Sequence, residues 1–317
     1  MPRRFTVIII HRNGFDRLKK TLDSITSAAT SSEEIFIIDN ASTDDSINRI
    51  STLFPKVNII RNDFNSGYGH AANQGIKKGV GDYFLICNND IVVPSNIFDE
   101  LESVFKKDVN VGIVSGQLTD INRNRVRTSY TRPSLTSEFD RIGRFGRLIK
   151  TIKKTHYQDP EIISEVGVIG GACLGVRKKM IDNIGAYDED FFFYFEDTEW
   201  CIRAWRNGWK VILNPNIEIA HIGGSSSSEF YKESRIEFYR SRMIFWKKIY
   251  PLHISILLHL WNIPKLFLDF LFYLIMNILT LGQNKKLNKK FMDRILIVQW
   301  LVLGKPKSWG LPNKSCQ

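Results

Sequence analysis

The sequence predicts an α/β fold in which helices flank a mostly parallel central sheet, followed by an apolar helical extension at the C-terminus. Across the first 116 residues, short apolar runs alternate with amphipathic helical stretches. This rhythm is typical of doubly wound parallel sheets. From about residue 234 onward, long apolar stretches bordered by lysines replace it, and this change predicts the extension.

Each expected strand of the first half is a short apolar run rich in β-branched residues. These strands are expected at Phe5–Ile10, Glu34–Ile38, Val57–Ile60, Asp82–Cys87 and Val111–Ser115. Apolar residues at helical spacing, such as Leu18, Leu22 and Ile25, predict the intervening helices. Later helices are expected from near Asp44, with Ser42 or Thr43 as the cap, and over Tyr68–Lys78 and Asn96–Lys106.

The second half is less regular. Residues 117–160 form an irregular, basic region that we expect to be a variable loop or acceptor region, with cationic residues at Arg141, Arg144, Arg147, Lys150, Lys153 and Lys154. Further elements are expected as a Gly-rich strand segment at Glu165–Val176, a helix from Glu196 to Asn207, and strands at Lys210–Leu213 and Ile217–His221. A polar loop is expected at Ser225–Ser228.

The C-terminal region contains one mixed helix, Glu233–Ile249, and two strongly apolar stretches, Leu252–Ile263 and Leu266–Leu281, which Pro264 is expected to separate. A membrane-spanning helix needs roughly 20 apolar residues, and each stretch is shorter. We therefore expect a pair of interfacial or shallowly inserted helices. A tilted span and a soluble helical core are the alternatives.

The formal net charge of +11 and the pI near 9.4 indicate an anionic partner. Lysines border the apolar stretches at Lys247, Lys248, Lys285, Lys286, Lys289 and Lys290. Such flanks favour a membrane surface over nucleic acid, for which the chain carries no motif. Four scattered cysteines and an N-terminus without signal-peptide features favour a reducing, cytoplasmic location for the catalytic part.

Polar residues follow several expected strands, where ligands of parallel α/β sheets bind. Asp39 is suited to accept hydrogen bonds from a nucleobase or ribose, or to cap a turn. Asp90, in Asn88-Asn89-Asp90, suits Mg²⁺ or Mn²⁺ held together with substrate phosphates, or forms a polar turn. His221 suits Mn²⁺ better than Mg²⁺, unless its role is structural.

Three carboxylates, Glu196, Asp197 and Glu199, follow a run of five aromatic residues. Apolar surroundings raise the pKa of a carboxylate and make it a better base. The structural alternative is favourable interaction with a helix N-terminus. The Gly-rich stretch from Asn65 to Asn73 does not follow the first strand and lacks the spacing of a dinucleotide-binding loop.

Taken in order, these segments resemble glycosyltransferase family 2, the inverting enzymes with the Rossmann-like GT-A fold. The resemblance covers residues 5 to 245 and rests on the first strand with Asn13, DNASTDDS, NSGYGHAANQG, NND, GGACLGVRKKMIDNIGAYDEDFFFYFEDTEWCIRAWRNGW and AHIGGSS. Within the family, the sequence is most similar to bacterial rhamnosyltransferases that act on lipid-linked or polysaccharide acceptors, as in O-antigen synthesis.

The resemblance implies a role for each matching residue. Asp197 would be the general base, with Glu196 as the second choice. Asp90 would bind the divalent ion, Mg²⁺ or Mn²⁺, with His221 as a further ligand. Donor nucleotide-binding residues would be His11, Asn13, Asp39, Asn40, Asn65, Gly67, Asn73 and Asn89, with Asp39 on the nucleobase. The sugar and acceptor pocket would involve Gly170, Gly171 and Trp200.

Two positions depart from the family pattern. Asn88-Asn89-Asp90 has one carboxylate fewer than the usual metal motif, so the donor diphosphate would supply most of the metal ligands. His11 and Arg12 stand where Thr and Tyr usually precede the asparagine. The expected catalytic domain is 1–233, with a donor half at 1–116 and an acceptor half at 117–233, and a helical, membrane-associating region at 234–317.

The expected reaction is transfer of a sugar from a nucleoside-diphosphate donor to a lipid-linked or polysaccharide acceptor. dTDP-rhamnose is the first choice of donor and a UDP-hexose the second. A non-catalytic nucleotide-binding module is the alternative, but it has no need for Glu196 and Asp197. A nucleotidyltransferase would need a Gly-rich loop after the first strand, which His11-Arg12-Asn13-Gly14 matches poorly.

Overall fold

The computed structural model describes residues 5–29, 33–141, 157–222 and 230–311. The chain divides into two compact units, one formed by Met1–Arg132 with Tyr157–Ser226 and the other by Pro133–His156 with Ser227–Gln317. The sequence-based division instead placed its boundary after residue 233. The basic residues from Arg144 to Lys154 and the polar loop Ser225–Ser228 lie outside the described residues.

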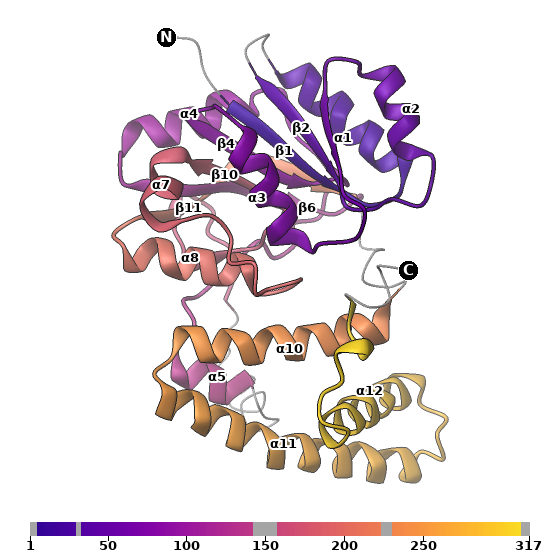
Figure 1. Cartoon of the computed structure of the whole chain (residues 1–317). Helices are drawn as coiled ribbons and strands as arrows, with labels where there is room; N and C mark the ends of the chain where they lie inside the picture. Colours follow the sequence, from indigo (N-terminus) through magenta and orange to yellow (C-terminus); the bar gives the residue numbers. More distant parts are fainter. Residues whose placement is uncertain (1–4, 30–32, 142–156, 223–229, 312–317) are drawn as a thin grey trace. The chain divides into compact units, whose positions relative to one another are not determined.

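The first unit is built on a nine-stranded mixed sheet, as far as its described residues extend (Figure 1). Its strands run in the order β3-β2-β1-β4-β10-β6-β11-β5, and β8 pairs with β11. The strands are β1 (Phe5–His11), β2 (Glu34–Asp39), β3 (Asn58–Arg61), β4 (Tyr83–Asn88), β5 (Ile91–Val92), β6 (Val111–Thr119), β8 (Ser164–Glu165), β10 (Cys173–Arg177) and β11 (Lys210–His221).

The N-terminal half of the sheet is parallel, as the sequence predicts. β3, β2, β1 and β4 pair in parallel, and β11 is parallel to β6. β10 lies between β4 and β6 and is antiparallel to both. β11 joins the two expected strands into one, with an irregularity between Asn214 and Glu218. Pro215 lies in this irregularity, where its missing N–H removes no ladder hydrogen bond.

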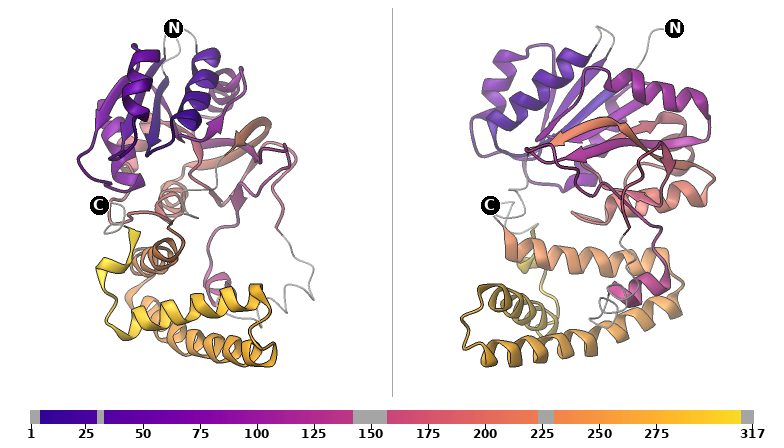
Figure 2. Two further views of the ribbon diagram at one scale, coloured as in Figure 1. Left: turned by 90° about the vertical axis from the view of Figure 1, so that its right-hand side faces the viewer. Right: turned by 180° about the vertical axis from the view of Figure 1, so that it is seen from behind.

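Helices cover both faces of the sheet (Figure 2). The alternation of side chains along β1 explains why, since Val7 and Ile9 belong to one buried cluster and Ile8 and Ile10 to the other. The first cluster includes residues of α1 (Phe15–Ala28), α2 (Ser46–Leu53) and α4 (Ile97–Lys107). The second includes residues of α3 (Tyr68–Lys78), α7 (Lys178–Ile184) and α8 (Glu196–Arg206).

One expected helix cap is wrong. α2 begins at Ser46, and its N-cap residue Asp45 makes no side-chain capping bond. Ser42 and Thr43 bond to Asn13 instead of capping α2. The region expected to be irregular also contains short elements, namely β7 (Ser129–Tyr130), which pairs with β9 (Val168–Ile169), and α5 (Leu135–Arg141).

The second unit is helical. It contains α5, α10 (Tyr231–Ile249), α11 (Leu252–Leu279), α12 (Lys285–Val302) and the short 3₁₀ helix η1 (Lys307–Trp309). Residues from α10, α11 and α12 form its buried cluster, including Ile236, Leu266 and Trp300. Glu138 of α5 is fully buried and accepts hydrogen bonds from Arg242 (3.0 Å) and Trp246 (2.9 Å).

The expected break at Pro264 is wrong, because α11 runs unbroken from Leu252 to Leu279 with Pro264 inside it. Buried residues lie on both sides of the proline, at Leu258, Asn262, Leu266 and Asp269. Packing therefore continues across a position where the isolated chain would tend to break. By length and composition alone, this helix is long and apolar enough to cross a membrane.

The polarity of α11 is inverted relative to a helix of a soluble protein. Its buried stripe includes polar side chains, namely those of Ser255, Asn262 and Asp269. Most of its large apolar side chains are exposed, at Leu252, Ile256, Leu257, Leu260, Trp261, Ile263, Phe267, Leu268, Phe272, Ile275, Ile278 and Leu279. An apolar surface of this extent is typical of a membrane or protein contact.

Candidate functional site

The strand pairing brings several of the predicted polar residues to one edge of the sheet. His11, the last residue of β1, pairs in register with Asp39, the last residue of β2. Asn88, at the end of β4, pairs with Ile10, and His221, at the end of β11, pairs with Ile91. This is the carboxyl edge of the parallel strands, where ligands of such sheets bind.

His11 lies fully buried beneath this edge. Asn89 donates to its Nδ1 (2.7 Å), so the ring proton is on Nε2, which donates to Ser46 Oγ (2.8 Å). Burial lowers the pKa of His11 to about 4, so the ring is neutral. Ser46 in turn donates to Asp44. His11 thus connects Asn89, beside the metal-motif position, with the loop that follows β2.

This burial predicts a pH-dependent contribution to stability. His11 stays neutral in the folded state, whereas the unfolded chain takes up a proton below about pH 6.5. The contribution of His11 to the free energy of unfolding is therefore fully present above pH 6.5 and is lost as the pH falls toward 4. The loss amounts to about 3 kcal/mol. The free energy of unfolding of a His11→Gln variant, measured by chemical denaturation, should fall about 3 kcal/mol less than that of wild type between pH 6.5 and pH 4. Equal pH profiles would contradict a neutral, buried His11.

Asn13 organises the loop between β2 and α2. Its backbone is left-handed (φ 54°), as is that of Ala41 (φ 61°). Its side chain accepts from Thr43 N (2.7 Å) and donates to Thr43 Oγ1 (3.2 Å). Asp39 is buried and accepts from Ser42 N (3.0 Å). The DNAST segment is therefore a tightly bonded loop that presents Asp39 at the edge of the sheet.

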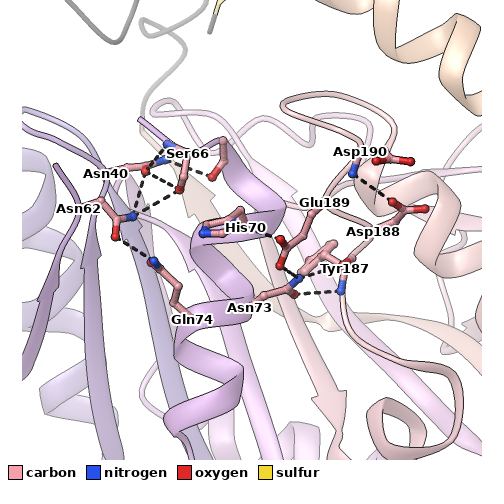
Figure 3. Close-up of polar contacts among 11 residues, drawn as sticks. Asn40, Asn62, Ser66, His70, Asn73, Gln74, Tyr187, Asp188, Glu189 and Asp190 are labelled. Atoms are coloured by element: carbon pink, nitrogen blue, oxygen red, sulfur yellow. Dashed lines mark hydrogen bonds and ion pairs between the residues drawn. The ribbon is translucent and has the colours of Figure 1, made fainter. Parts of the chain in front are cut away.

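Asn40 and Asn65 are also brought together, and their amides hold the loop before α3. Asn40 donates to Asn65 Oδ1 (2.7 Å) and to the carbonyl of Gly67 (3.1 Å). It also accepts from Ser66 N (2.9 Å), as Figure 3 shows. Asn62, which the sequence analysis missed, donates to Asn40 (3.2 Å). Gly67 has φ +89°, and a Cβ there would lie 2.5 Å from the Phe192 carbonyl oxygen.

Asn73 of α3 forms hydrogen bonds with the loop between α7 and α8 (Figure 3). Its amide accepts from Tyr187 N (3.0 Å) and donates to Tyr187 O (2.9 Å) and Glu189 Oε1 (2.8 Å). His70, one turn earlier on α3, contacts the other oxygen of Glu189 (2.8 Å). Nothing in the local sequence indicates these partners, because they are more than a hundred residues away.

Asp197 lies in the first turn of α8, after Tyr194 and Phe195, which both have left-handed backbones. Its carboxylate accepts from Gly171 N (2.8 Å) and from Thr198 Oγ1 (3.1 Å). Burial raises its pKa, although these hydrogen bonds act in the opposite direction. The predicted base and the predicted pocket glycine therefore contact each other directly.

The remaining pocket residues are arranged around this contact. Tyr68 donates to the carbonyl of Gly171 (2.8 Å), while Gly170 N donates to Thr128 O (3.0 Å). Glu196, next to Asp197, is buried. Trp200 is fully buried, donates to Gly185 O (3.0 Å) and packs against Tyr187 (4.1 Å between ring centroids). Trp200 therefore supports the site from the core.

Asp90 and His221 form the candidate metal centre. Asp90 Oδ1 is buried and lies 3.1 Å from Nε2 of His221. This contact raises the pKa of His221, against the effect of burial. No group of three or more His, Cys, Asp or Glu in the described ranges could hold a metal ion. One carboxylate and one imidazole suit Mn²⁺ when substrate phosphates supply the other ligands.

The chain is similar in sequence to a family model and to known glycosyltransferases. The model of a family described as "Glycosyl transferase family 2" matches residues 6–185. N-acetylglucosaminyl-diphospho-decaprenol L-rhamnosyltransferase of Mycobacterium tuberculosis is 24% identical over 220 residues, or 64% of this chain and 71% of the relative. Low-salt glycan biosynthesis hexosyltransferase Agl10 of Haloferax volcanii is 24% identical over 277 residues, or 83% of this chain and 85% of the relative.

A solved structure supports the fold. Mannosyltransferase PcManGT from Pyrobaculum calidifontis, in complex with GDP-Man and Mn²⁺, aligns with a TM-score of 0.56 and 16% sequence identity. The alignment covers 95% of this chain and 87% of that one. Together with the mixed sheet flanked by helices, this likeness confirms the GT-A fold expected from the sequence.

Proposed function

This chain belongs to glycosyl transferase family 2, whose model matches more than half of its length, and on that premise we propose that it is an inverting rhamnosyltransferase. It moves L-rhamnose from a nucleoside-diphosphate donor to a hydroxyl of a lipid-linked or polysaccharide acceptor. The first choice of donor is dTDP-rhamnose. The relative from Mycobacterium tuberculosis, an L-rhamnosyltransferase by name, supports this sugar.

The observation that carries the proposal is the partly buried carboxylate of Asp197, which accepts a hydrogen bond from Gly171 N. A carboxylate whose pKa is raised by burial is suited to take a proton from an alcohol. Asp197 removes the proton of the acceptor hydroxyl while that oxygen attacks the anomeric carbon. The bond from this carbon to the donor diphosphate breaks on the opposite face, so the configuration inverts.

Asp90 and His221 are the residues that would hold the divalent ion, because they are the carboxylate and imidazole that meet at this edge of the sheet. When bound, the ion neutralises charge on the leaving diphosphate. Asp39, at the end of β2, recognises the nucleobase in this proposal. His11, Asn13, Asn40, Asn65 and Asn73 act by holding the loops around the donor, as their hydrogen bonds indicate.

We further assign catalysis to residues 1–233 and membrane association to residues 234–317. The support is the polarity of α11, most of whose large apolar side chains are exposed. A lipid-linked acceptor presents its sugar at the membrane surface, so an enzyme held there meets its substrate. The proposed location is the cytoplasmic face of the membrane, with the helices lying on it or shallowly inserted.

The test is thermal unfolding of the full chain with dTDP, UDP or GDP, each with and without Mn²⁺. A nucleotide at 100 times its Kd should stabilise the protein by about 2.7 kcal/mol. We expect the largest Mn²⁺-dependent shift with dTDP. A shift with UDP and with neither of the other nucleotides would identify UDP, not dTDP, as the donor nucleotide. The absence of a shift with every nucleoside diphosphate would contradict the transferase proposal.

A further inference from the structure

The second unit contains a basic pocket that the proposed transfer reaction does not use. Its volume is about 300 Å³, and residues of α10, α11 and α12 line it. Five cationic side chains contribute to the lining, together with a single carboxylate. They are Arg235, Lys286, Lys289, Lys290 and Arg294, with Asp293 as the carboxylate. The pocket therefore carries a large excess of positive charge.

The carboxylates nearby do not neutralise this excess. Asp293 accepts a hydrogen bond from Tyr231 (2.7 Å) and lies 4.0 Å from Arg235. Arg294 contacts Asp269, at 3.5 Å. No carboxylate in the described part of the chain forms an ion pair with Lys286, Lys289 or Lys290. Lys289 is held over the ring of Tyr231, 4.2 Å from its centroid.

Charge and volume together indicate the kind of ligand. Several cationic donors around one small cavity suit a compact anion with several acceptor oxygens, and phosphate has this form.

The helix α11, which contributes Tyr273 to the pocket, also carries exposed apolar side chains. Ile275, Ile278 and Leu279 of α11 are 55%, 63% and 71% exposed, and Leu281 in the turn to α12 is 83% exposed. A cationic pocket in a helical unit that also exposes apolar side chains matches a molecule with a phosphate head and an apolar tail.

We infer that this pocket binds the phosphate group of a membrane lipid. The inference rests on the proposed function in expecting a membrane-bound substrate, and it adds a defined lipid-recognition site within the helical unit. Two lipids carry the required chemistry: an anionic phospholipid and the polyprenyl diphosphate of a lipid-linked acceptor. In both, Lys286 and Lys289 contact the phosphate oxygens.

The test is co-sedimentation of the full chain with vesicles, without any sugar donor. The three vesicle preparations are phosphatidylcholine alone, phosphatidylcholine with a minor fraction of phosphatidic acid, and phosphatidylcholine with a minor fraction of polyprenyl diphosphate. The Lys286→Gln/Lys289→Gln variant should bind anionic vesicles about thirty-fold more weakly, since each lysine near an anionic surface contributes roughly fivefold. Both lysines are exposed, so the variant should fold.

A matched control is Lys77→Gln/Lys78→Gln, which removes the same charge from two exposed positions of α3. It should bind nearly as well as wild type. Conversely, Asp293→Asn removes the one carboxylate of the pocket and should strengthen binding roughly fivefold. Loss confined to the polyprenyl diphosphate vesicles would identify the acceptor lipid, and equal loss on both would identify a general phospholipid site.

Three results would overturn the inference. One is unchanged binding of the Lys286→Gln/Lys289→Gln variant to both anionic vesicles, and another is an equal loss in the α3 control. The third is binding of inorganic pyrophosphate in solution that depends on Lys286 and Lys289 while vesicles do not bind. Because no donor is present, each of these results is independent of whether the protein transfers rhamnose.

Discussion

Replacing Asp197 with asparagine is expected to lower the rate of sugar transfer by about 100- to 10,000-fold, the range typical of a lost general base. Asparagine has nearly the same shape, and its oxygen still accepts from Gly171 N, as the carboxylate does at 2.8 Å. It cannot take up the proton of the acceptor hydroxyl. The variant should therefore fold and bind the donor, while turnover is lost.

The measurement is the initial rate of transfer over a range of donor concentrations, together with the thermal shift by the donor nucleotide. Glu196→Gln is the matched control, because Glu196 is the adjacent buried carboxylate. A larger loss in Glu196→Gln than in Asp197→Asn would transfer the role of base to Glu196. Near-normal turnover in both would exclude this pair from proton transfer. Since burial raises the pKa of Asp197, turnover of the wild type should fall as the pH drops through that raised value.

The second large effect is expected from Asp90→Asn, which should abolish stabilisation of the protein by Mn²⁺ together with the donor nucleotide. That stabilisation is about 2.7 kcal/mol at 100 times the Kd. Asp90 is the carboxylate that meets His221, 3.1 Å from its Nε2. Asparagine keeps the shape but removes the charge that attracts a divalent ion.

The measurement is thermal unfolding with and without Mn²⁺ at saturating nucleotide. His221→Ala should lose part of the same shift, because it removes the imidazole and keeps the carboxylate. Asp182→Asn is the control, since Asp182 is a surface carboxylate whose side chain is 60% exposed and pairs with Lys178. A Mn²⁺-dependent shift that survives in Asp90→Asn would place the ion elsewhere.

Much of the fold was predictable because hydrophobic periodicity is a local property. The helix Tyr68–Lys78 begins and ends where the sequence predicts, and the first four strands agree to within a residue or two. Antiparallel insertion of β10 between β4 and β6 was not predictable. A short buried strand looks the same whichever neighbours it pairs with.

Pro264 shows how tertiary contacts can override a local rule. Proline disfavours the interior of a helix, so the sequence indicates two helices shorter than a membrane span. Buried residues on both sides of it, such as Asn262 and Leu266, hold α11 as one continuous helix instead.

The sequence by itself determined the alternation of strands and helices, the family, and the placement of Asp39, Asp90 and His221 after strands. Only the tertiary structure decided which of these groups meet. Asn89 bonds to His11 across 78 residues, and Asn73 to Tyr187 across 114. The basic pocket likewise needs three helices to come together. A side chain's chemistry is encoded in its own position, whereas its partner depends on the path of the whole chain.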